Sequence, residues 1–389
     1  MKKQRIFLAD MRVDGSDQET EYRDYQLWAV EVGVDLEIVS VAELQLKEIA
    51  ASVNGTADGL LLLRDATSTL DEEALEKQLT PIDLPVVEVF IHDLGTHRFI
   101  DRTEPGCKIL RTMYGRLQRG VRWGMHFLKH CRDYPYATFS YGALPSHIGD
   151  FFLPEGEGPF PVVMVIHGGF WRDGYYRDSM HGVAADLTKK GFAAWNVEYR
   201  RVGPSGGGYP ESHQDVIRAL NYLSVLSNTH PLDLNRIAVI GHSAGGYLSV
   251  WAGSIPFGGL EQIMPKPEVP VQLVVSLAGV TDLDEAHKSG GGDQAATHFL
   301  KSAATDEALR KKLSMGYLHY ASETKLLLAH GTADEYVPVE LSEYTRDLLL
   351  ARGENEVELL LFPDSGHNEF TDPGSEEWQK VAERIEKLL

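Results

Sequence analysis

Cysteine is scarce in this sequence. Among 389 residues only Cys107 and Cys131 occur, which excludes a fold held together by a framework of disulfides. Long apolar runs are missing as well: no segment approaches the ~20 apolar residues of a membrane-spanning helix. The apolar run that follows the N-terminal lysines is too short for a signal peptide. We therefore expect a cytoplasmic protein that does not enter a membrane.

Positive charge is also in short supply, because 37 Lys and Arg residues face 57 Asp and Glu residues and leave a formal net charge of -20. An acidic surface repels the phosphates of nucleic acids and of anionic membranes. Neither is therefore an expected partner.

Signals for a cofactor or a metal are absent too. No Gly-x-Gly-x-x-Gly follows the first expected strand, and the glycine-rich stretches 205–208 and 289–292 are not followed by Gly-Lys-Ser/Thr. These stretches are expected to be flexible loops. His126 and His130 have the i, i+4 spacing of half a helical zinc site, but no second pair completes it. We expect neither a cofactor nor a metal.

What the sequence does contain is a repeated alternation of strands and helices, in two halves. In residues 1–135, short apolar strands alternate with amphipathic helices, which predicts a small, doubly wound, Rossmann- or flavodoxin-like α/β domain. The expected strands are 5–10, 35–40, 57–63 and 84–91, and the expected helices are 21–33, 41–53 and 69–79. Apolar residues at helical spacing then predict a helix or helix pair over 104–132. We consider two roles for this domain: a lid, or an oligomerisation module that would make the protein a homo-oligomer.

The second half, residues 136–389, alternates in the same way and predicts a mostly parallel sheet with helices on both faces. An entering strand pair is expected over 139–154, before the first buried strand at 160–166. A less regular insertion, at about 281–322, separates strand 271–279 from strand 325–331. We expect this insertion to form a cap.

One five-residue motif in this half, Gly241-His242-Ser243-Ala244-Gly245, has the form Gly-x-Ser-x-Gly. The same residues are also compatible with close helix packing. However, the motif joins a strand, 236–241, to a helix that begins at Ala244. A sharp strand-to-helix turn requires small neighbours and exposes its central side chain. The motif therefore predicts Ser243 as a nucleophile.

A serine hydroxyl needs a base, and the base needs an acid that orients it. His367 follows the last expected strand, 356–362, and is the candidate base. Asp334 follows strand 325–331 and is the candidate acid. Each residue lies at the carboxyl end of a strand, and the order Ser243, Asp334, His367 is the order of α/β-hydrolases.

The stretch His-Gly-Gly-Phe-Trp, residues 167–171, follows another buried strand. Glycines let backbone N–H groups approach a substrate carbonyl, so Gly168 or Gly169, together with Ala244, is predicted to form an oxyanion hole. Phe170 and Trp171 either line a substrate pocket or pack the loop, and the sequence leaves both roles open.

From about residue 137 onward the chain resembles the α/β-hydrolase superfamily. The motifs that carry this resemblance are "HGGFW", "NVEYRRVGPSGGGYPESHQDV", "GHSAGGYLSVWAG", "HGTADEYVP" and "SGH". They are most similar to the esterase/lipase branch that includes feruloyl/acetylxylan-type esterases and kynurenine formamidases. The resemblance implies that Ser243, Asp334 and His367 form a catalytic triad. Residues 1–135 have no counterpart in the usual members. The insertion lies where such enzymes carry cap elements and pocket residues, but its sequence is individual, so the resemblance implies no substrate.

The leading hypothesis is a serine carboxylesterase that acts on a small-molecule ester through an acyl-enzyme. An arylformamidase-like amidase with the same triad is the alternative enzyme, and a non-catalytic binding protein on a hydrolase scaffold is the alternative of another class. No β-rich, propeller-like half precedes the hydrolase half, which disfavours a peptidase of the prolyl-oligopeptidase type.

Overall fold

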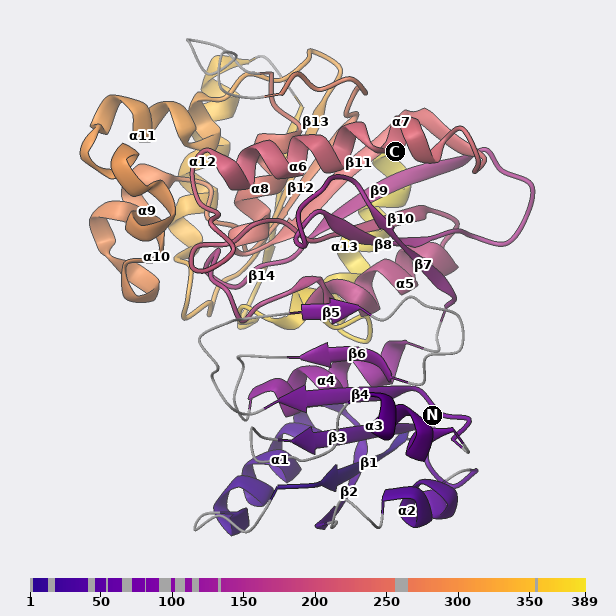
Figure 1. The fold of residues 1–389 in the computed structure, drawn as a ribbon. Helices are drawn as coiled ribbons and strands as arrows, with labels where there is room; N and C mark the ends of the chain where they lie inside the picture. The colour runs from indigo at the N-terminus through magenta and orange to yellow at the C-terminus, as the bar shows by residue number, and fades with distance from the viewer. Residues whose placement is uncertain are drawn as a thin grey trace. The chain divides into compact units, whose positions relative to one another are not determined.

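The computed structural model describes residues 3–12, 18–40, 46–53, 55–64, 72–80, 82–90, 99–101, 109–113, 119–131, 134–255, 265–353 and 356–389. The chain divides into two compact units, Met1–Pro135 and Tyr136–Leu389. Separate clusters of buried apolar side chains lie in the two units. Figure 1 shows the helices and strands of each unit.

The described part of the first unit forms a six-stranded sheet with the order β2-β1-β3-β4-β6-β5. Its strands are β1 Arg5–Asp10, β2 Asp35–Ser40, β3 Gly59–Arg64, β4 Val86–Phe90, β5 Phe99–Asp101 and β6 Ile109–Met113. Its helices are α1 Gln18–Val32, α2 Leu46–Val53, α3 Glu72–Leu79 and α4 Arg119–His130. Only β5 runs antiparallel to its neighbour. The order of the first four strands is that of a flavodoxin-like sheet, so the prediction of a small doubly wound domain is confirmed.

The predicted helix over 104–132 is wrong in its first part. Residues 109–113 form the strand β6, which pairs in parallel with β4, and the helix α4 begins only at Arg119. Ile109 and Thr112 are β-branched, which favours a strand. Apolar residues spaced three apart over so short a run do not distinguish a helix from a strand. Residues 102–108, with Cys107, and 114–118 lie outside the described part of the chain, as do residues 41–45 and 69–71 of the other expected helices.

The second unit contains an eight-stranded sheet with the order β14-β13-β12-β11-β9-β10-β8-β7. Its strands are β7 Tyr136–Ser140, β8 Ile148–Phe152, β9 Phe160–Ile166, β10 Ala193–Val197, β11 Leu232–His242, β12 Leu273–Leu277, β13 Lys325–Gly331 and β14 Val357–Phe362. Strand β8 runs antiparallel to both of its neighbours, β7 and β10. The six strands β9 to β14 run parallel to one another. The predicted mostly parallel sheet is confirmed.

Helices cover both faces of this sheet (Figure 1). They are α5 His181–Lys189, α6 Glu211–Asn221, α7 Leu223–Leu226, α8 Ala244–Ala252, α12 Val339–Arg352 and α13 Glu376–Leu388. Helices α6 and α8 share one core cluster with alternate residues of β9 and β11. Helices α5 and α13 are joined by a hydrogen bond of 2.8 Å from Trp378 Nε1 to Asp186 Oδ2. The central strands are buried on both faces, which explains their continuous Val, Ile and Leu runs.

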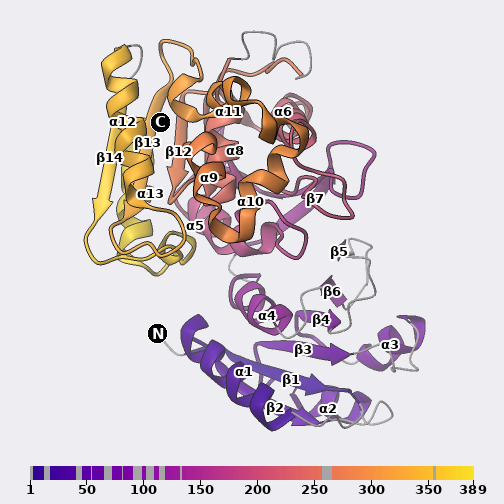
Figure 2. The same cartoon turned by 90° about the vertical axis from the view of Figure 1, so that its left-hand side faces the viewer.

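Residues 281–322, the expected cap, fold mainly into three short helices, which Figure 2 shows grouped together in orange. They are α9 Leu283–Ser289, α10 Gly291–Leu300 and α11 Glu307–Leu313. The sequence predicts a flexible loop at 289–292, but the structure places a tight junction between two helices there. Gly290 ends α9 with φ 66°, a conformation that glycine adopts without a Cβ penalty. In the described part of the chain, no helix is both long and apolar enough to cross a membrane.

Candidate active site

Ser243 occupies the turn between β11 and α8, with φ 55° and ψ -119°. A positive φ is costly for a residue with a side chain, so the surrounding structure must impose it. The backbone N–H of Ser243 donates a hydrogen bond of 2.8 Å to the carbonyl of Leu277, on the neighbouring strand β12. The side chain therefore projects from a strained and fixed turn at the carboxyl edge of the sheet, as the motif predicts.

Two glycines make this turn sterically feasible. A Cβ on Gly241 would lie 2.0 Å from the carbonyl oxygen of Gly245. A Cβ on Gly245 would lie 2.4 Å from the oxygen of Ile166 and 2.3 Å from that of His167, at the end of β9. Contacts this short do not occur, so only glycine fits at the two positions. The first and last residues of the motif therefore let helix α8 pack against two strand ends.

The structure brings His367 and Asp334 together across 33 residues of sequence. His367 Nδ1 donates a hydrogen bond of 2.6 Å to Asp334 Oδ2. Both side chains are buried, and they lie on the loops that follow β14 and β13. The backbone of His367 is also held beside Ser243, because His242 Nε2 donates to the carbonyl of His367 at 2.8 Å. The described residues show no hydrogen bond from Ser243 Oγ to His367; such contacts often form only when substrate binds.

Several hydrogen-bond donors stabilise the ionised form of Asp334. Its Oδ1 accepts hydrogen bonds from the backbone N–H groups of Tyr336, at 2.8 Å, and Val337, at 2.9 Å. His330 Nε2 lies 3.2 Å from its Oδ2. Burial alone raises the pKa of Asp334, but the hydrogen bonds from His330 and His367 outweigh burial and hold the pKa well below its ordinary value. The carboxylate is therefore ionised whenever the protein is folded at neutral pH.

His330 and His242 are the two supporting histidines that the sequence reasoning missed. His330 is fully buried, and its Nδ1 accepts a hydrogen bond of 2.7 Å from Ser342. His242 appears in the sequence only as the variable residue of the motif. Burial, followed by the neighbouring His367, lowers the pKa of His242 to about 3, so its ring is neutral. Only their contacts with His367 and Asp334 in three dimensions identify them, because the sequence around each histidine carries no signature of its own.

The predicted oxyanion loop lies directly against the serine. A Cβ on Gly168 would meet the Ser243 Cβ at 3.0 Å and the His242 carbonyl at 2.8 Å, so the Gly168 backbone approaches the serine closely. Gly169 has φ 106°, which turns the chain away after this contact. Within the described residues, the N–H groups of Gly168, Gly169 and Ala244 donate no hydrogen bond to another residue. These three N–H groups are therefore available to a ligand.

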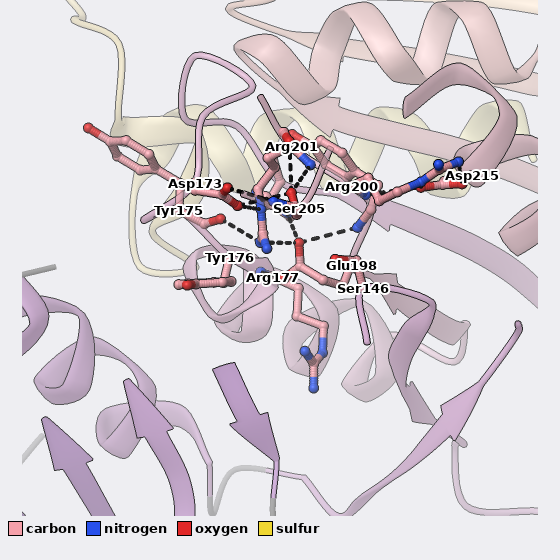
Figure 3. Close-up of polar contacts among 12 residues, drawn as sticks. Ser146, Asp173, Tyr175, Tyr176, Arg177, Glu198, Arg200, Arg201, Ser205 and Asp215 are labelled. Carbon is pink, nitrogen blue, oxygen red and sulfur yellow. Dashed lines mark hydrogen bonds and ion pairs between the residues drawn. The ribbon is translucent and has the colours of Figure 1, made fainter. Parts of the chain in front are cut away.

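A buried ionic network lies behind the loop (Figure 3). Glu198 accepts hydrogen bonds from His167 Nε2 at 2.8 Å and from Arg201 Nη1 at 2.5 Å. Arg201 also donates to the carbonyl of Tyr175 at 2.9 Å and to Asp173 at 3.2 Å. Burial raises the pKa of Glu198, but Arg201 and His167 together lower it to about 2. The network fixes both ends of the loop, and the sequence indicated it only through the charged residues that follow β10.

Phe170 and Trp171 play different parts. Both touch a cavity of about 310 Å³ beside Ser243. Trp171 is almost fully buried and stacks on Phe299 of the cap, with ring centroids 4.5 Å apart. Phe170 is only partly buried, and its ring lies 6.3 Å from that of Tyr336 across the cavity. Among the described residues, no group of His, Cys, Asp and Glu side chains is arranged to hold a metal ion.

Comparison with known proteins gives a family match. The BD-FAE family model matches residues 150–349, which is just over half of the chain. Esterase LipC of Mycobacterium tuberculosis is 26% identical over 252 residues, which cover 62% of this chain and 61% of that protein. The probable carboxylic ester hydrolase LipM of the same organism is 30% identical over 137 residues, which cover 34% and 31%. The acylamino-acid-releasing enzyme of Rattus norvegicus is 28% identical over 264 residues, which cover 64% and 34%. The chain thus spans less than two thirds of each of these relatives.

Solved structures agree on the fold. A truncated carbohydrate esterase from gut microbiota aligns with a TM-score of 0.57 and 20% identity, over 66% of this chain and 98% of that one. Esterase B from Lactobacillus rhamnosis aligns with a TM-score of 0.59 and 20% identity, over 70% and 91%. The strand order, the turn at Ser243 and the family match lead to one conclusion. The chain belongs to the BD-FAE family, and its second unit has the α/β-hydrolase fold.

Proposed function

We propose that this protein is a serine hydrolase that cleaves a carboxylic ester through an acyl-enzyme, with Ser243 as nucleophile, His367 as base and Asp334 as the orienting acid. The observation that carries the proposal is the strained turn that presents Ser243 beside a buried His367–Asp334 pair. Its membership of the BD-FAE family and its similarity to proteins named as esterases support the same chemistry.

In the first half of the reaction, Ser243 Oγ attacks the ester carbonyl carbon while His367 Nε2 takes the hydroxyl proton. Asp334, already ionised, stabilises the imidazolium that forms. The carbonyl π electrons move to the oxygen, which becomes an oxyanion. When the tetrahedral intermediate collapses, the carbon–oxygen bond to the alcohol breaks, and His367 gives its proton to the departing alkoxide.

In the second half, His367 takes a proton from water, and the resulting hydroxide attacks the acyl carbon. Collapse of this second intermediate releases the carboxylic acid and returns the proton to Ser243. The oxyanion of both intermediates would accept hydrogen bonds from the N–H of Ala244 and from that of Gly168 or Gly169. Removing one such donor typically costs about 10²–10³-fold in kcat.

Labelling with a fluorophosphonate probe, together with hydrolysis of 4-nitrophenyl acetate, tests this proposal. We expect the wild-type protein to be labelled and to hydrolyse the ester. We expect Ser243→Ala to lose labelling and about 10⁴-fold or more of kcat. Ser302→Ala, at an exposed serine of the cap segment, is the matched control and should behave as wild type. Absence of labelling in the wild type, or equal labelling of Ser243→Ala, would contradict the proposal.

A further inference from the structure

The wall of the cavity beside Ser243 is mainly apolar. Its volume of about 310 Å³ is at the small end of ligand pockets. Its wall is built from Phe170 of the oxyanion loop, Ala295 and Ala296 of α10, and Val280 and Leu341. The chain at the start of α10 packs closely against this wall, because a Cβ at position 292 would meet the Phe170 ring at 2.6 Å. The cavity is therefore a small apolar chamber that ends at the proposed nucleophile.

The position of the cavity indicates which part of an ester it would hold. Ser243, Ala244 and Phe170 line it, so it begins at the oxyanion side of the site. His367 would protonate the leaving alcohol, yet it is not among the described residues of the cavity wall. The alcohol must lie beside His367 during this step, so the cavity receives the acyl group.

The charged groups around the cavity have one sign. Glu285 and Glu340 are exposed and line the cavity, and no Lys, Arg or His is among its described lining residues. Cations on neighbouring elements are held by cap residues: Lys288 Nζ lies 2.8 Å from the Asp284 carboxylate, and Arg172 donates to the backbone carbonyl of Asp293 at 2.5 Å. An acyl chain that ends in a carboxylate would meet an apolar wall, two like charges and no partner. Burying an anion without a partner is costly.

We infer that the protein selects esters whose acyl group is uncharged, apolar and of short to medium length, and that it rejects acyl groups carrying a carboxylate. This inference rests on the proposed serine hydrolase function and names its substrate class. The apolar wall of the cavity provides the affinity for the acyl chain of the substrate. Glu285 and Glu340 strengthen the discrimination against anions.

Three 4-nitrophenyl esters with acyl chains of different length and charge test the inference: acetate, hexanoate and the monoester of adipic acid. With wild-type protein we expect a kcat/KM for the adipate monoester at least about a hundredfold below that for the hexanoate. The double variant Glu285→Gln/Glu340→Gln should narrow this ratio by roughly fivefold. Glu343→Gln, which removes a carboxylate from the same helix α12 but outside the cavity wall, should leave the ratio unchanged. Equal turnover of adipate and hexanoate esters by the wild type would overturn the inference.

Filling the chamber tests its assignment to the acyl group. Ala296→Leu should lower the hexanoate-to-acetate ratio of kcat/KM by about tenfold. Ala286→Leu, on the more exposed α9 wall, repeats the test should the first variant not fold. An unchanged ratio in a folded variant would show that the acyl chain lies elsewhere. Failure of the proposed function has a different signature, because the wild type would then hydrolyse neither acetate nor hexanoate and would escape the fluorophosphonate probe.

Discussion

At the scale of single residues, the histidines near the site divide by what their rings contact. His367 donates to Asp334, and His330 contacts the same oxygen from the other side. Because an ionised carboxylate has about four acceptor sites, the two backbone donors and the two histidines saturate Asp334. A saturated carboxylate cannot turn, so His367 is held in one tautomer with Nε2 as the acceptor.

Replacing His330 tests this positioning role. His330→Leu removes one of the hydrogen bonds that hold the Asp334 carboxylate in place and keep its pKa low. We expect kcat to fall roughly tenfold at pH 7 with KM little changed, since only the orientation of the base is affected. His330→Gln, which keeps a donor, should recover most of kcat. Separate measurement of kcat and KM for both variants decides the matter, and a wild-type kcat in folded His330→Leu would refute the role.

His213 offers a test of stability rather than of catalysis. It lies on α6 and is fully buried against α8, with its Nε2 2.7 Å from Tyr247 Oη, and burial lowers its pKa from 6.5 to about 3. The unfolded chain binds a proton below pH 6.5 and the folded chain does not. The stability from this histidine is therefore complete above pH 6.5 and is lost as the pH falls toward 3.

Denaturant unfolding at pH 7.5 and pH 5 measures this loss. Between these pH values, the free energy of unfolding of His213→Phe should fall by about 2 kcal/mol less than that of the wild type. The difference between the two pH values is the readout, because the substitution itself also changes packing. His298→Gln, at an exposed position, should keep the wild-type pH dependence. A parallel pH dependence in His213→Phe would contradict the assignment.

At the scale of elements, the turn at Ser243 depends on how closely α8 approaches the ends of β9 and β11. Gly245→Ala would place a methyl group 2.3 Å from the His167 carbonyl, against backbone that cannot move aside. We expect a loss of roughly 1–3 kcal/mol in the free energy of unfolding and a large loss of fluorophosphonate labelling, because the turn must open. Gly291→Ala meets only the Ser289 Oγ, at 3.7 Å, and should keep wild-type stability. Equal stability of the two variants, measured by denaturant unfolding, would show that the turn is not close-packed.

The same elements show which features of the fold and the site could be predicted from the sequence. Ser243, Asp334 and His367 each follow an apolar strand, so one rule about strand ends placed them at the same sheet edge. The support from His330 and Glu198 could not be predicted, because it depends on side chains that meet across elements. The prediction of a helix over 109–113 is wrong because five residues are too few to distinguish a helical from a strand periodicity. The glycines at 290–292 predict a flexible loop, whereas the structure forms a sharp turn between two helices there.

At the scale of the whole molecule, the two units have independent cores. The cluster around Leu60 and Leu62 contains only first-unit residues, and the large cluster around β9 and β11 contains only second-unit residues. Units with separate cores are expected to unfold separately. Calorimetry or denaturant unfolding of the full chain should therefore show two transitions, and a single cooperative transition would indicate coupling between the units.

We predict that the first unit is either a lid or an oligomerisation module, and a fragment that lacks this unit tests both roles. All residues proposed for catalysis, and the cavity beside Ser243, lie in the second unit. A fragment of residues 136–389 should therefore hydrolyse 4-nitrophenyl acetate within about threefold of the full chain. If the first unit is an oligomerisation module, light scattering will give a smaller assembly for the fragment. If it is a lid, the fragment will gain activity on large esters relative to acetate. A fragment with the same oligomeric state as the full chain and the same preference between large and small esters would exclude both roles.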